Sequence, residues 1–351
     1  MKNDVYARLR ELYDRLPGGF PETDSGVEIK ILQKMYTPEE AEIVVNLSQI
    51  PQPVREIAKN AGRDEADVGM QLEAMAKRGI IYRIPGGEES LFVAIPFLIG
   101  AWEGQVWTRG DREFAELANA YFPYIAKVWS NLKTQQTRVI PVNSAIASTS
   151  AVGPYDKIRE LAAQKDKIAV ARCTCGIETE LLGGSCNYPL ERCISFGFNA
   201  ENLISLNLAR EISQKELTEF LDMGEEKGLV LNVGNAKNLD FICMCCGCCC
   251  VLLKMLKLGG KPGEQVRSSF YATIDEELCT ACGTCEERCQ INAVVAGEDA
   301  YEINRARCIG CGVCVSTCPV EAIRLVEKPE LPMNETFAET MQQILVERKL
   351  A

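Results

Sequence analysis

The chain contains no histidine among its 351 residues. Histidine is the commonest metal ligand in proteins and the side chain that most readily exchanges protons near neutral pH. Its absence excludes His-ligated haem, His-ligated zinc, Rieske centres and catalysis by a histidine base. Any metal in this protein is therefore held mainly by thiolate, which the 18 cysteines can supply.

Positive charge and long apolar runs are also scarce. The 38 lysines and arginines are outnumbered by 49 acidic residues, giving a net charge of -11. This balance disfavours a nucleic-acid partner and suits docking onto basic patches of redox proteins. The apolar run FICMCCGCCCVLL is shorter than the roughly 20 residues that cross a bilayer, and the start MKNDVYARLR lacks an apolar signal segment. We therefore expect a cytoplasmic protein with reduced thiols and no membrane span.

The most specific pattern consists of eight cysteines in two quartets, each with the spacing C-x2-C-x2-C-x3-C. Iron–sulfur clusters select thiolate ligands, and the fourth cysteine of such a run ligates the other cluster in two-cluster proteins. This spacing assigns Cys279, Cys282, Cys285 and Cys318 to one [4Fe-4S] cluster, and Cys308, Cys311, Cys314 and Cys289 to the other. Zinc sites instead use two C-x2-C pairs that lie far apart.

The two quartets belong to an internal repeat, in which Ile274 aligns with Ile303 and Cys279 with Cys308. With this repeat, residues 270–326 resemble the bacterial two-cluster ferredoxins. The resemblance implies a fold of two β-hairpins and short helices around two cubanes that pass single electrons at low potential. One departure stands out, because the family's proline after the fourth cysteine is present as Pro319 but replaced by Gln290 in the first quartet.

The other ten cysteines lie within residues 154–262, where alternating strand and helix patterns predict a central Cys-rich α/β domain. Cys173, Cys175, Cys186 and Cys193 are candidates for a third cubane, a zinc site or buried inert thiols. Cys243, Cys245, Cys246, Cys248, Cys249 and Cys250 are candidates for a further cluster, a cluster shared with the first group, or a redox-active dithiol. Both groups follow predicted strands, so we expect them to converge at one edge of a sheet.

The N-terminal part carries no cysteine. Residues 1–36 predict an amphipathic helix, and residues 37–135 predict three helices, a hairpin and an aromatic-rich helical scaffold. The order over residues 37–96 resembles the winged-helix domain of transcription regulators, in pattern only. Its third helix opens with Arg63, Asp64, Glu65 and Asp67, which would repel phosphate. We expect this part to be scaffold or a docking surface.

Two segments complete the chain. Residues 136–153 predict a linker, and residues 327–351 predict a docking helix with Phe337, Met341, Ile344 and Leu345 on one face. The predicted fold class is multi-domain α+β, with an N-terminal winged-helix-like helical domain, a central α/β Cys-rich domain and a C-terminal ferredoxin-like domain.

The predicted function is single-electron relay, in an anaerobe, between two ferredoxin-type [4Fe-4S] clusters and a middle domain that binds one or two further clusters, or zinc instead. The partner would be a separate catalytic oxidoreductase subunit. One alternative is a reductase whose active site lies in the middle domain at residues 243–250, and another is a redox-sensing winged-helix regulator. No glycine-rich nucleotide loop is present, so we do not expect direct oxidation of NAD(P)H.

Overall fold

The computed structural model describes residues 4–86, 89–146, 156–329 and 332–350. These residues form two compact units, which are described separately here. Unit 1 comprises Met1–Asn131, Ile177–Gly184 and Leu345–Ala351, and unit 2 comprises Leu132–Gly176 and Ser185–Ile344. All 18 cysteines belong to unit 2. Among the described residues, no helix combines the length and the apolar character needed to cross a bilayer.

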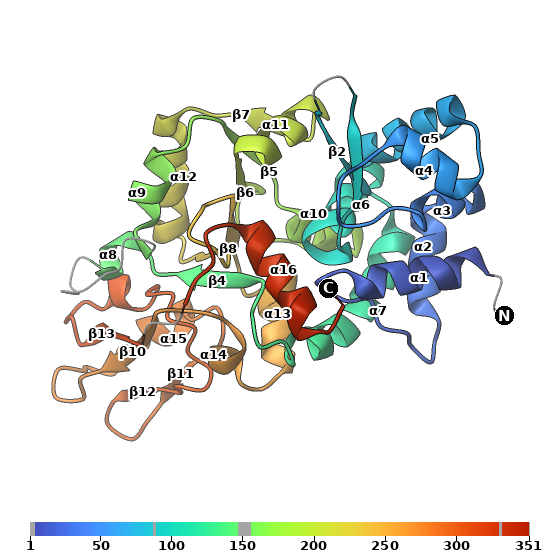
Figure 1. Ribbon diagram of the computed structural model, residues 1–351. Coiled ribbons are helices and arrows are strands. Elements are labelled where there is room, and N and C mark those ends of the chain that lie inside the picture. Colours follow the sequence, from blue (N-terminus) through green and yellow to red (C-terminus); the bar gives the residue numbers. More distant parts are fainter. Residues whose placement is uncertain (1–3, 87–88, 147–155, 330–331, 351) are drawn as a thin grey trace. The chain divides into compact units, whose positions relative to one another are not determined.

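Unit 1 is mainly helical (Figure 1). Its helices are α1 (Val5–Arg15), α2 (Val27–Met35), α3 (Pro38–Val44), α4 (Val54–Ala61), α5 (Glu65–Lys77), α6 (Trp102–Arg109) and α7 (Arg112–Trp129). Its antiparallel sheet has the order β1 (Gln52–Pro53), β3 (Leu91–Ala94), β2 (Ile81–Ile84). Residues 1–36 therefore hold two helices where one was predicted, because Ile31, Leu32 and Met35 form a second buried helical stripe.

The core of unit 1 is built largely from the aromatic residues of the predicted scaffold, although Tyr124 is exposed. Phe97, Trp102, Tyr121 and Phe122 are at most 5% exposed, and the indole nitrogen of Trp129 donates to the carbonyl oxygen of Gly18 at 3.0 Å. The elements from α3 to β3 follow the order helix, strand, helix, helix, strand, strand. A relationship to winged-helix domains rests on this order alone and stays a prediction.

Unit 2 is built on a six-stranded sheet with the order β4-β8-β9-β6-β5-β7. The strands are β4 (Thr137–Ile140), β5 (Ile168–Arg172), β6 (Glu191–Phe196), β7 (Ala209–Glu211), β8 (Val230–Gly234) and β9 (Phe241–Cys245). All of its neighbouring strands pair antiparallel. The predicted alternation of strands and helices is present, but it does not produce neighbouring parallel strands.

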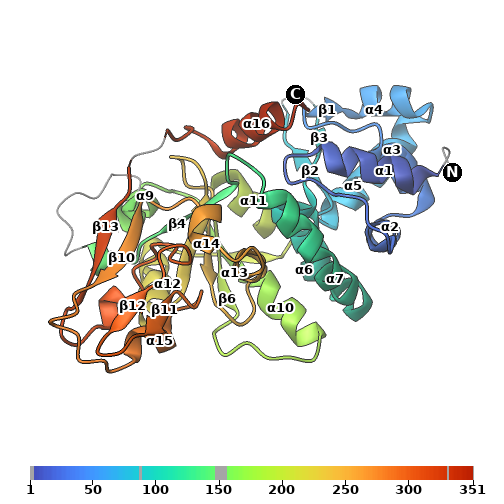
Figure 2. The ribbon, with the colours of Figure 1, turned by 90° about the horizontal axis from the view of Figure 1, so that it is seen from below.

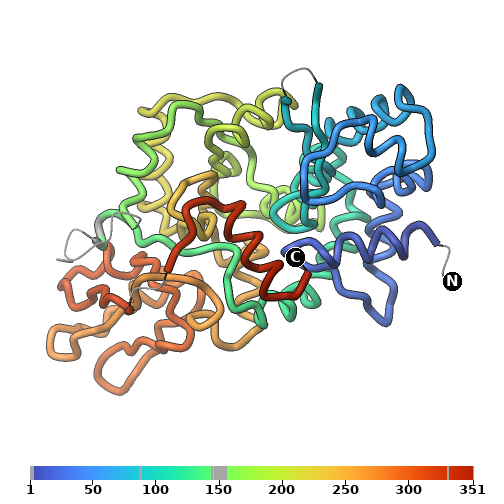
Figure 3. Tube along the Cα trace, in the orientation of Figure 1, coloured from blue at the N-terminus to red at the C-terminus, as the bar shows by residue number. Residues whose placement is uncertain are grey.

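Helices cover one face of this sheet. The helices of unit 2 are α8 (Asn143–Ile146), α9 (Ile158–Ala163), α11 (Gly197–Ser205), α12 (Gln214–Glu226), α13 (Val251–Leu258) and α14 (Pro262–Gln265), while α10 (Thr174–Leu181) and α16 (Phe337–Glu347) belong partly to each unit. Ile158 of α9 and Leu221 of α12 share a core with Ile194, Ile242 and Met244 of the sheet. Figures 1 and 3 show α9 and α12 side by side along this face.

The predicted linker at residues 136–153 begins inside the sheet. Thr137–Ile140 form the edge strand β4, whose four residues are all buried and pair with β8. This strand was missed because its short run TRVI lies between a polar stretch and Pro141. Residues 147–153 of the predicted linker lie outside the described residues.

The ferredoxin-like segment forms two antiparallel strand pairs, grouped with α15 in Figure 2. They are β10 (Phe270–Ile274) with β13 (Ile323–Glu327), and β11 (Val294–Ala296) with β12 (Tyr301–Ile303), with α15 at Thr284–Arg288 and a short turn at Val315–Thr317. The repeat extends to the backbone, because Asn292 and the equivalent Glu321 have positive φ angles of 56° and 54°. The tail helix α16 places the ring of Phe337 5.8 Å from that of Phe241.

Candidate metal centre

The sheet brings the two groups of middle cysteines to one edge. Strands β5 and β9 both pair antiparallel with β6, which lies between them, so they run in the same direction. Cys173 directly follows β5, and the run CGCCC directly follows Cys245 at the end of β9. Their C-terminal ends therefore meet at the same edge of the sheet.

The alternation of side chains along β9 separates its cysteines between the two faces. Ile242 and Met244 point into the core beneath α9 and α12, and Cys246 belongs to the same core. Cys243 and Cys245 alternate with them and face the other side of the sheet. One short run of cysteines thus supplies thiols to two different places.

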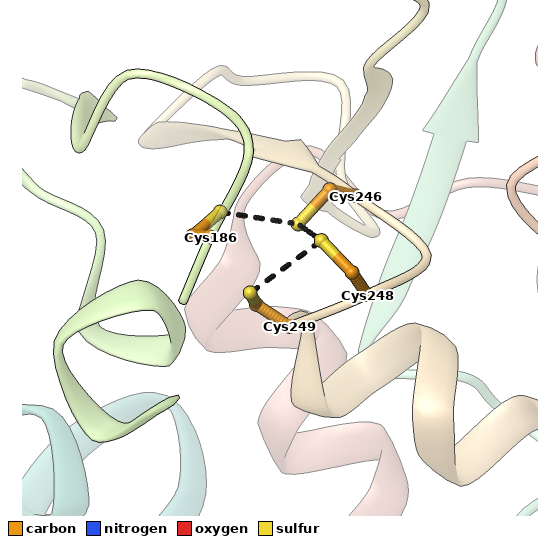
Figure 4. A group of neighbouring side chains, drawn as sticks. All are labelled: Cys186, Cys246, Cys248 and Cys249. Atoms are coloured by element: carbon orange, nitrogen blue, oxygen red, sulfur yellow. Dashed lines mark hydrogen bonds between the residues drawn. The ribbon is translucent and has the colours of Figure 1, made fainter. Parts of the chain in front are cut away.

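The first place is a group of four thiols, those of Cys186, Cys246, Cys248 and Cys249. Their sulfur atoms all lie within 4.8 Å of one another. Successive Sγ–Sγ distances are 3.9 Å, 3.4 Å and 3.5 Å. Figure 4 shows Cys186 reaching the group from a separate loop, while the other three come from the turn between β9 and α13.

The spacing of these four sulfurs fits one tetrahedral ion. A metal–sulfur bond of about 2.3 Å implies sulfur–sulfur edges of about 3.8 Å around a tetrahedron. The ligand sulfurs of a cubane each bind a different iron and stand farther apart. We call Cys186, Cys246, Cys248 and Cys249 the four-thiol centre.

Arg192 supplies positive charge to this centre. Its Nη2 donates to the sulfurs of Cys186 at 3.1 Å, Cys246 at 3.4 Å and Cys173 at 3.5 Å. The side chain is only 1% exposed, so its charge requires buried partners. Although burial opposes ionisation of Cys246, Arg192 and hydrogen bonds from the backbone and from Cys248 hold the pKa of that thiol at about 7.

The second place lies around Cys175. The backbone N–H of Val251 donates to its sulfur at 3.4 Å, and its thiol lies within hydrogen-bonding reach of Cys173 and Cys250. The thiol of Cys245 also lies within hydrogen-bonding reach of Cys250. A hydrogen bond with Cys193, together with burial, raises the pKa of Cys243 well above its ordinary value.

The structure therefore groups the middle cysteines differently from their order in the sequence. Cys186 joins three cysteines that follow β9, whereas Cys173, Cys175 and Cys193 lie with the other thiols of residues 243–250. Sequence reasoning also missed Arg192. The only hint in the sequence is that Arg192 directly precedes Cys193. In a strand this order places the two side chains on opposite faces of β6.

Backbone N–H groups point at the ferredoxin-like cysteines in a repeated pattern. Ala293 donates to the sulfur of Cys289 at 3.1 Å, and Ala322 donates to that of Cys318 at 3.3 Å. Ala272 donates to the sulfur of Cys308 at 3.3 Å. Such bonds stabilise thiolate and raise the reduction potential of a cluster.

Cys289 lies near the three cysteines of the second quartet, the set to which the sequence assigns it. Burial raises the pKa values of Cys308, Cys311 and Cys314, and the nearby Cys289 raises each of them further. Burial also raises the pKa of the Cys285 thiol, and Cys282 and Cys279 of its own quartet raise it further. All eight donors are thiols in two sets, which fits iron–sulfur clusters. The individual ligand assignments stay predictions.

The residue that replaces the ferredoxin proline connects the two cysteine regions. The backbone N–H of Gly247 donates to Oε1 of Gln290 at 2.6 Å, while Nε2 of Gln290 donates to the carbonyl of Gly228 at 2.9 Å and the hydroxyl of Tyr188 at 3.2 Å. A Cβ atom on Gly247 would lie 2.6 Å from the backbone oxygen of Gln290, so the approach requires glycine. Gln290 directly follows Cys289, and Gly247 lies between Cys246 and Cys248.

Comparison with known proteins agrees with the C-terminal part of this description. Residues 272–325 match the model of the 4Fe-4S dicluster domain. A ferredoxin of Acetoanaerobium sticklandii is 47% identical over 35 residues, which cover 10% of this chain and 62% of the ferredoxin. No solved structure matches the chain. The chain thus carries a ferredoxin-type 4Fe-4S domain, which we call the ferredoxin module (residues 270–326).

Proposed function

We propose that this chain is an electron-transfer protein in which the ferredoxin module exchanges single electrons with the four-thiol centre. The observation that supports this most strongly is the hydrogen bond between Gln290 and Gly247. It joins the residue next to Cys289 to the turn that carries Cys246 and Cys248. A short path therefore links Cys289 to Cys246 through two peptide groups, the Gln290 side chain and one hydrogen bond.

The residues around this path hold it in place. Lys257 donates from Nζ to the carbonyl oxygen of Gly247 at 3.2 Å, and Arg288 donates to the carbonyl oxygens of Glu225 and Glu226. The ferredoxin module is thereby attached to the sheet-bearing part of unit 2 at several points. A [4Fe-4S] cluster, when bound, takes up or releases one electron without breaking a bond.

The four-thiol centre would take part in this exchange with iron, which is redox-active in thiolate coordination, whereas zinc has no redox chemistry. Its four thiolates carry a large negative charge that must be balanced. Arg192 contributes to that balance through hydrogen bonds to Cys186 and Cys246. The external partner in our proposal is a separate catalytic oxidoreductase subunit with a basic docking surface, which complements the net charge of -11.

The test compares Gln290→Leu with Pro319→Leu, which changes the equivalent position of the repeat. The anaerobic protein is mixed with a one-electron reductant and frozen at intervals, and electron paramagnetic resonance follows each metal centre. We expect Gln290→Leu to slow the arrival of electrons at the four-thiol centre at unchanged iron content, and Pro319→Leu to leave it at the wild-type rate. Equal rates in the wild type and both variants would contradict the proposed path.

A second candidate function is favoured by the exposure of one thiol. Cys248 is exposed, and its sulfur lies 3.4 Å from that of Cys246, whose pKa is about 7. Such a pair could reduce a disulfide, with two electrons from the ferredoxin module and two protons from water yielding two thiols. Reduction of an added organic disulfide that is lost in Cys248→Ser would support this reductase. Turnover that survives the substitution would exclude Cys248 as its active thiol.

A further inference from the structure

A row of small and polar side chains crosses the sheet on the face opposite the core beneath α9 and α12. Ala171 pairs with Cys193, Cys193 with Cys243, and Cys243 with Asn232, on the successive strands β5, β6, β9 and β8. Paired residues of antiparallel strands share a face and lie about 5 Å apart. Cys245 lies two residues beyond Cys243 and so points to the same face.

Three further thiols continue this row at the edge of the sheet. Cys250 lies directly before α13 and within hydrogen-bonding reach of Cys245 and Cys175, and Cys175 reaches Cys173. The backbone N–H of Val251 points at the sulfur of Cys175. The connected set is Cys173, Cys175, Cys193, Cys243, Cys245 and Cys250, which we call the six-thiol group.

Asn232 points to a ligand in this place. Its side chain is 0% exposed, and neither its amide nitrogen nor its amide oxygen has a hydrogen-bond partner within the described ranges. Burying such an amide without a partner costs on the order of 1–3 kcal/mol. An unsatisfied buried polar group in a native protein calls for a missing partner. The register places this amide beside Cys243.

We infer that the six-thiol group holds a polynuclear iron–sulfur cluster, and that Asn232 donates a hydrogen bond from its amide to a sulfur of that cluster. Six thiols exceed the four positions around a single tetrahedral ion. Buried thiolates also need positive charge, and Arg192 reaches the group at Cys173. Several metal ions with bridging sulfide would balance the thiolate charge and give the orphaned amide nitrogen of Asn232 an acceptor.

This site is distinct from the four-thiol centre and does not depend on the electron path through Gln290. A mononuclear centre adds a metal ion but no inorganic sulfide, whereas a polynuclear iron–sulfur cluster adds both. Acid-labile sulfide therefore separates the two kinds of site.

The experiment counts iron, zinc and acid-labile sulfide per chain in anaerobically reconstituted full-length protein. The two cubanes of the ferredoxin module account for about eight sulfides. We expect distinctly more than this in the wild-type chain, and a loss of the excess in the double variant Cys243→Ala/Cys245→Ala. The matched variant Cys248→Ala, in the four-thiol centre, should keep it. A wild-type count of about eight sulfides would overturn the inference, and this result does not require any variant to fold.

Asn232→Leu tests the hydrogen bond itself. We expect the variant to keep its iron and sulfide while the reduction potential of the additional cluster becomes more negative, because an N–H···S bond stabilises the reduced form. If the reduction potential of the additional cluster were unchanged in Asn232→Leu, Asn232 would not donate a hydrogen bond to it. The potentials of the ferredoxin module should be the same in both proteins and serve as the internal reference. A slower electron path in Gln290→Leu with an unchanged sulfide count would leave this inference intact.

Discussion

The backbone N–H of Gly247 lies 2.6 Å from Oε1 of Gln290, and these two residues directly adjoin Cys246 and Cys289. Proline, which the ferredoxin pattern has at this position, has no side-chain group that could accept the bond. Gln290 also donates from Nε2 to Gly228 and Tyr188. A departure from the ferredoxin pattern thus supplies one of the contacts that join the module to the rest of unit 2.

Gly247→Ala should weaken this junction. The added Cβ would meet the backbone oxygen of Gln290 at 2.6 Å, and overpacking of this kind costs about 1–3 kcal/mol. We expect a lower free energy of unfolding for unit 2, measured by urea denaturation of the anaerobic holoprotein. Gly69→Ala in α5 of unit 1, whose nearest contact is an ordinary 3.4 Å, is the control and should leave the unfolding of unit 2 unchanged. Equal stability of Gly247→Ala and the wild type would show that the turn can move away from Gln290.

Arg192→Gln should lower the metal affinity of the four-thiol centre. The substitution removes the positive charge that contacts Cys186 and Cys246, and loss of an outer-shell partner typically lowers metal affinity by about 10–100-fold. Competition with a chromophoric chelator for cobalt(II) measures the affinity. The affinity of Arg192→Lys should lie between that of Arg192→Gln and that of the wild type. Arg210→Gln, at a half-exposed surface ion pair, is the control. An affinity unchanged in Arg192→Gln would contradict this role.

Glu103 should make unit 1 less stable as the pH rises. Burial raises the pKa of its carboxyl to about 7, although the backbone N–H groups of Ile99 and Gly100 donate to it. Because the folded value exceeds the unfolded value of 4.5, its contribution to stability is full below pH 4.5 and disappears as the pH rises through 7. We expect a loss of about 2 kcal/mol, less than the full shift implies, since the side chain is partly exposed.

Urea unfolding followed by tryptophan fluorescence measures this effect, since all three tryptophans belong to unit 1. Glu103→Gln should remove the dependence between pH 4.5 and 7, whereas Glu116→Gln, on an exposed side chain, should retain it. The same slope in the wild type and Glu103→Gln would assign the pH dependence to other groups.

Helix α5 should not bind DNA. Its first turn carries Glu65 and Asp67, its cap is Asp64, and the guanidinium of Arg63 is held by Asp67 at 2.6 Å. Duplex phosphate would meet negative charge at the position where a winged-helix regulator presents basic residues. We expect no retarded band in a gel-shift assay at physiological salt, with or without oxidant. A salt-dependent shift would revive the regulator hypothesis.

Local patterns predicted the parts of this fold that depend on neighbouring residues. The spacing of Cys279, Cys282 and Cys285 is sufficient to predict a cluster loop, because these ligands come from a single turn of chain. The start of α3 likewise depends on neighbouring residues, because Thr37 and Glu40 form a capping box there. The replacement of proline by Gln290 was visible, but its partner Gly247 was not.

The grouping of the middle cysteines could not be predicted, because it depends on pairing between distant strands. Cys186 meets Cys246 only because β6 lies between β5 and β9. That strand order follows from how whole elements pack, which no spacing of cysteines encodes. The alternation of Cys243 and Cys246 between opposite faces was accessible in principle, but its use requires the bounds of β9. The role inferred for Asn232 could not be predicted either, because a single asparagine in a strand belongs to no recognisable motif.

The central claim is that electrons pass from the ferredoxin module to iron in the four-thiol centre. Mössbauer spectroscopy of protein reconstituted with iron-57, before and after anaerobic addition of a protein electron donor, tests it most directly. We predict a mononuclear iron site with four sulfur ligands that changes from ferric to ferrous in the wild type, one electron per site. In Cys308→Ala, which disables one predicted cubane, this reduction should be slow. Zinc in place of this iron, or equally fast reduction in Cys308→Ala, would contradict the account.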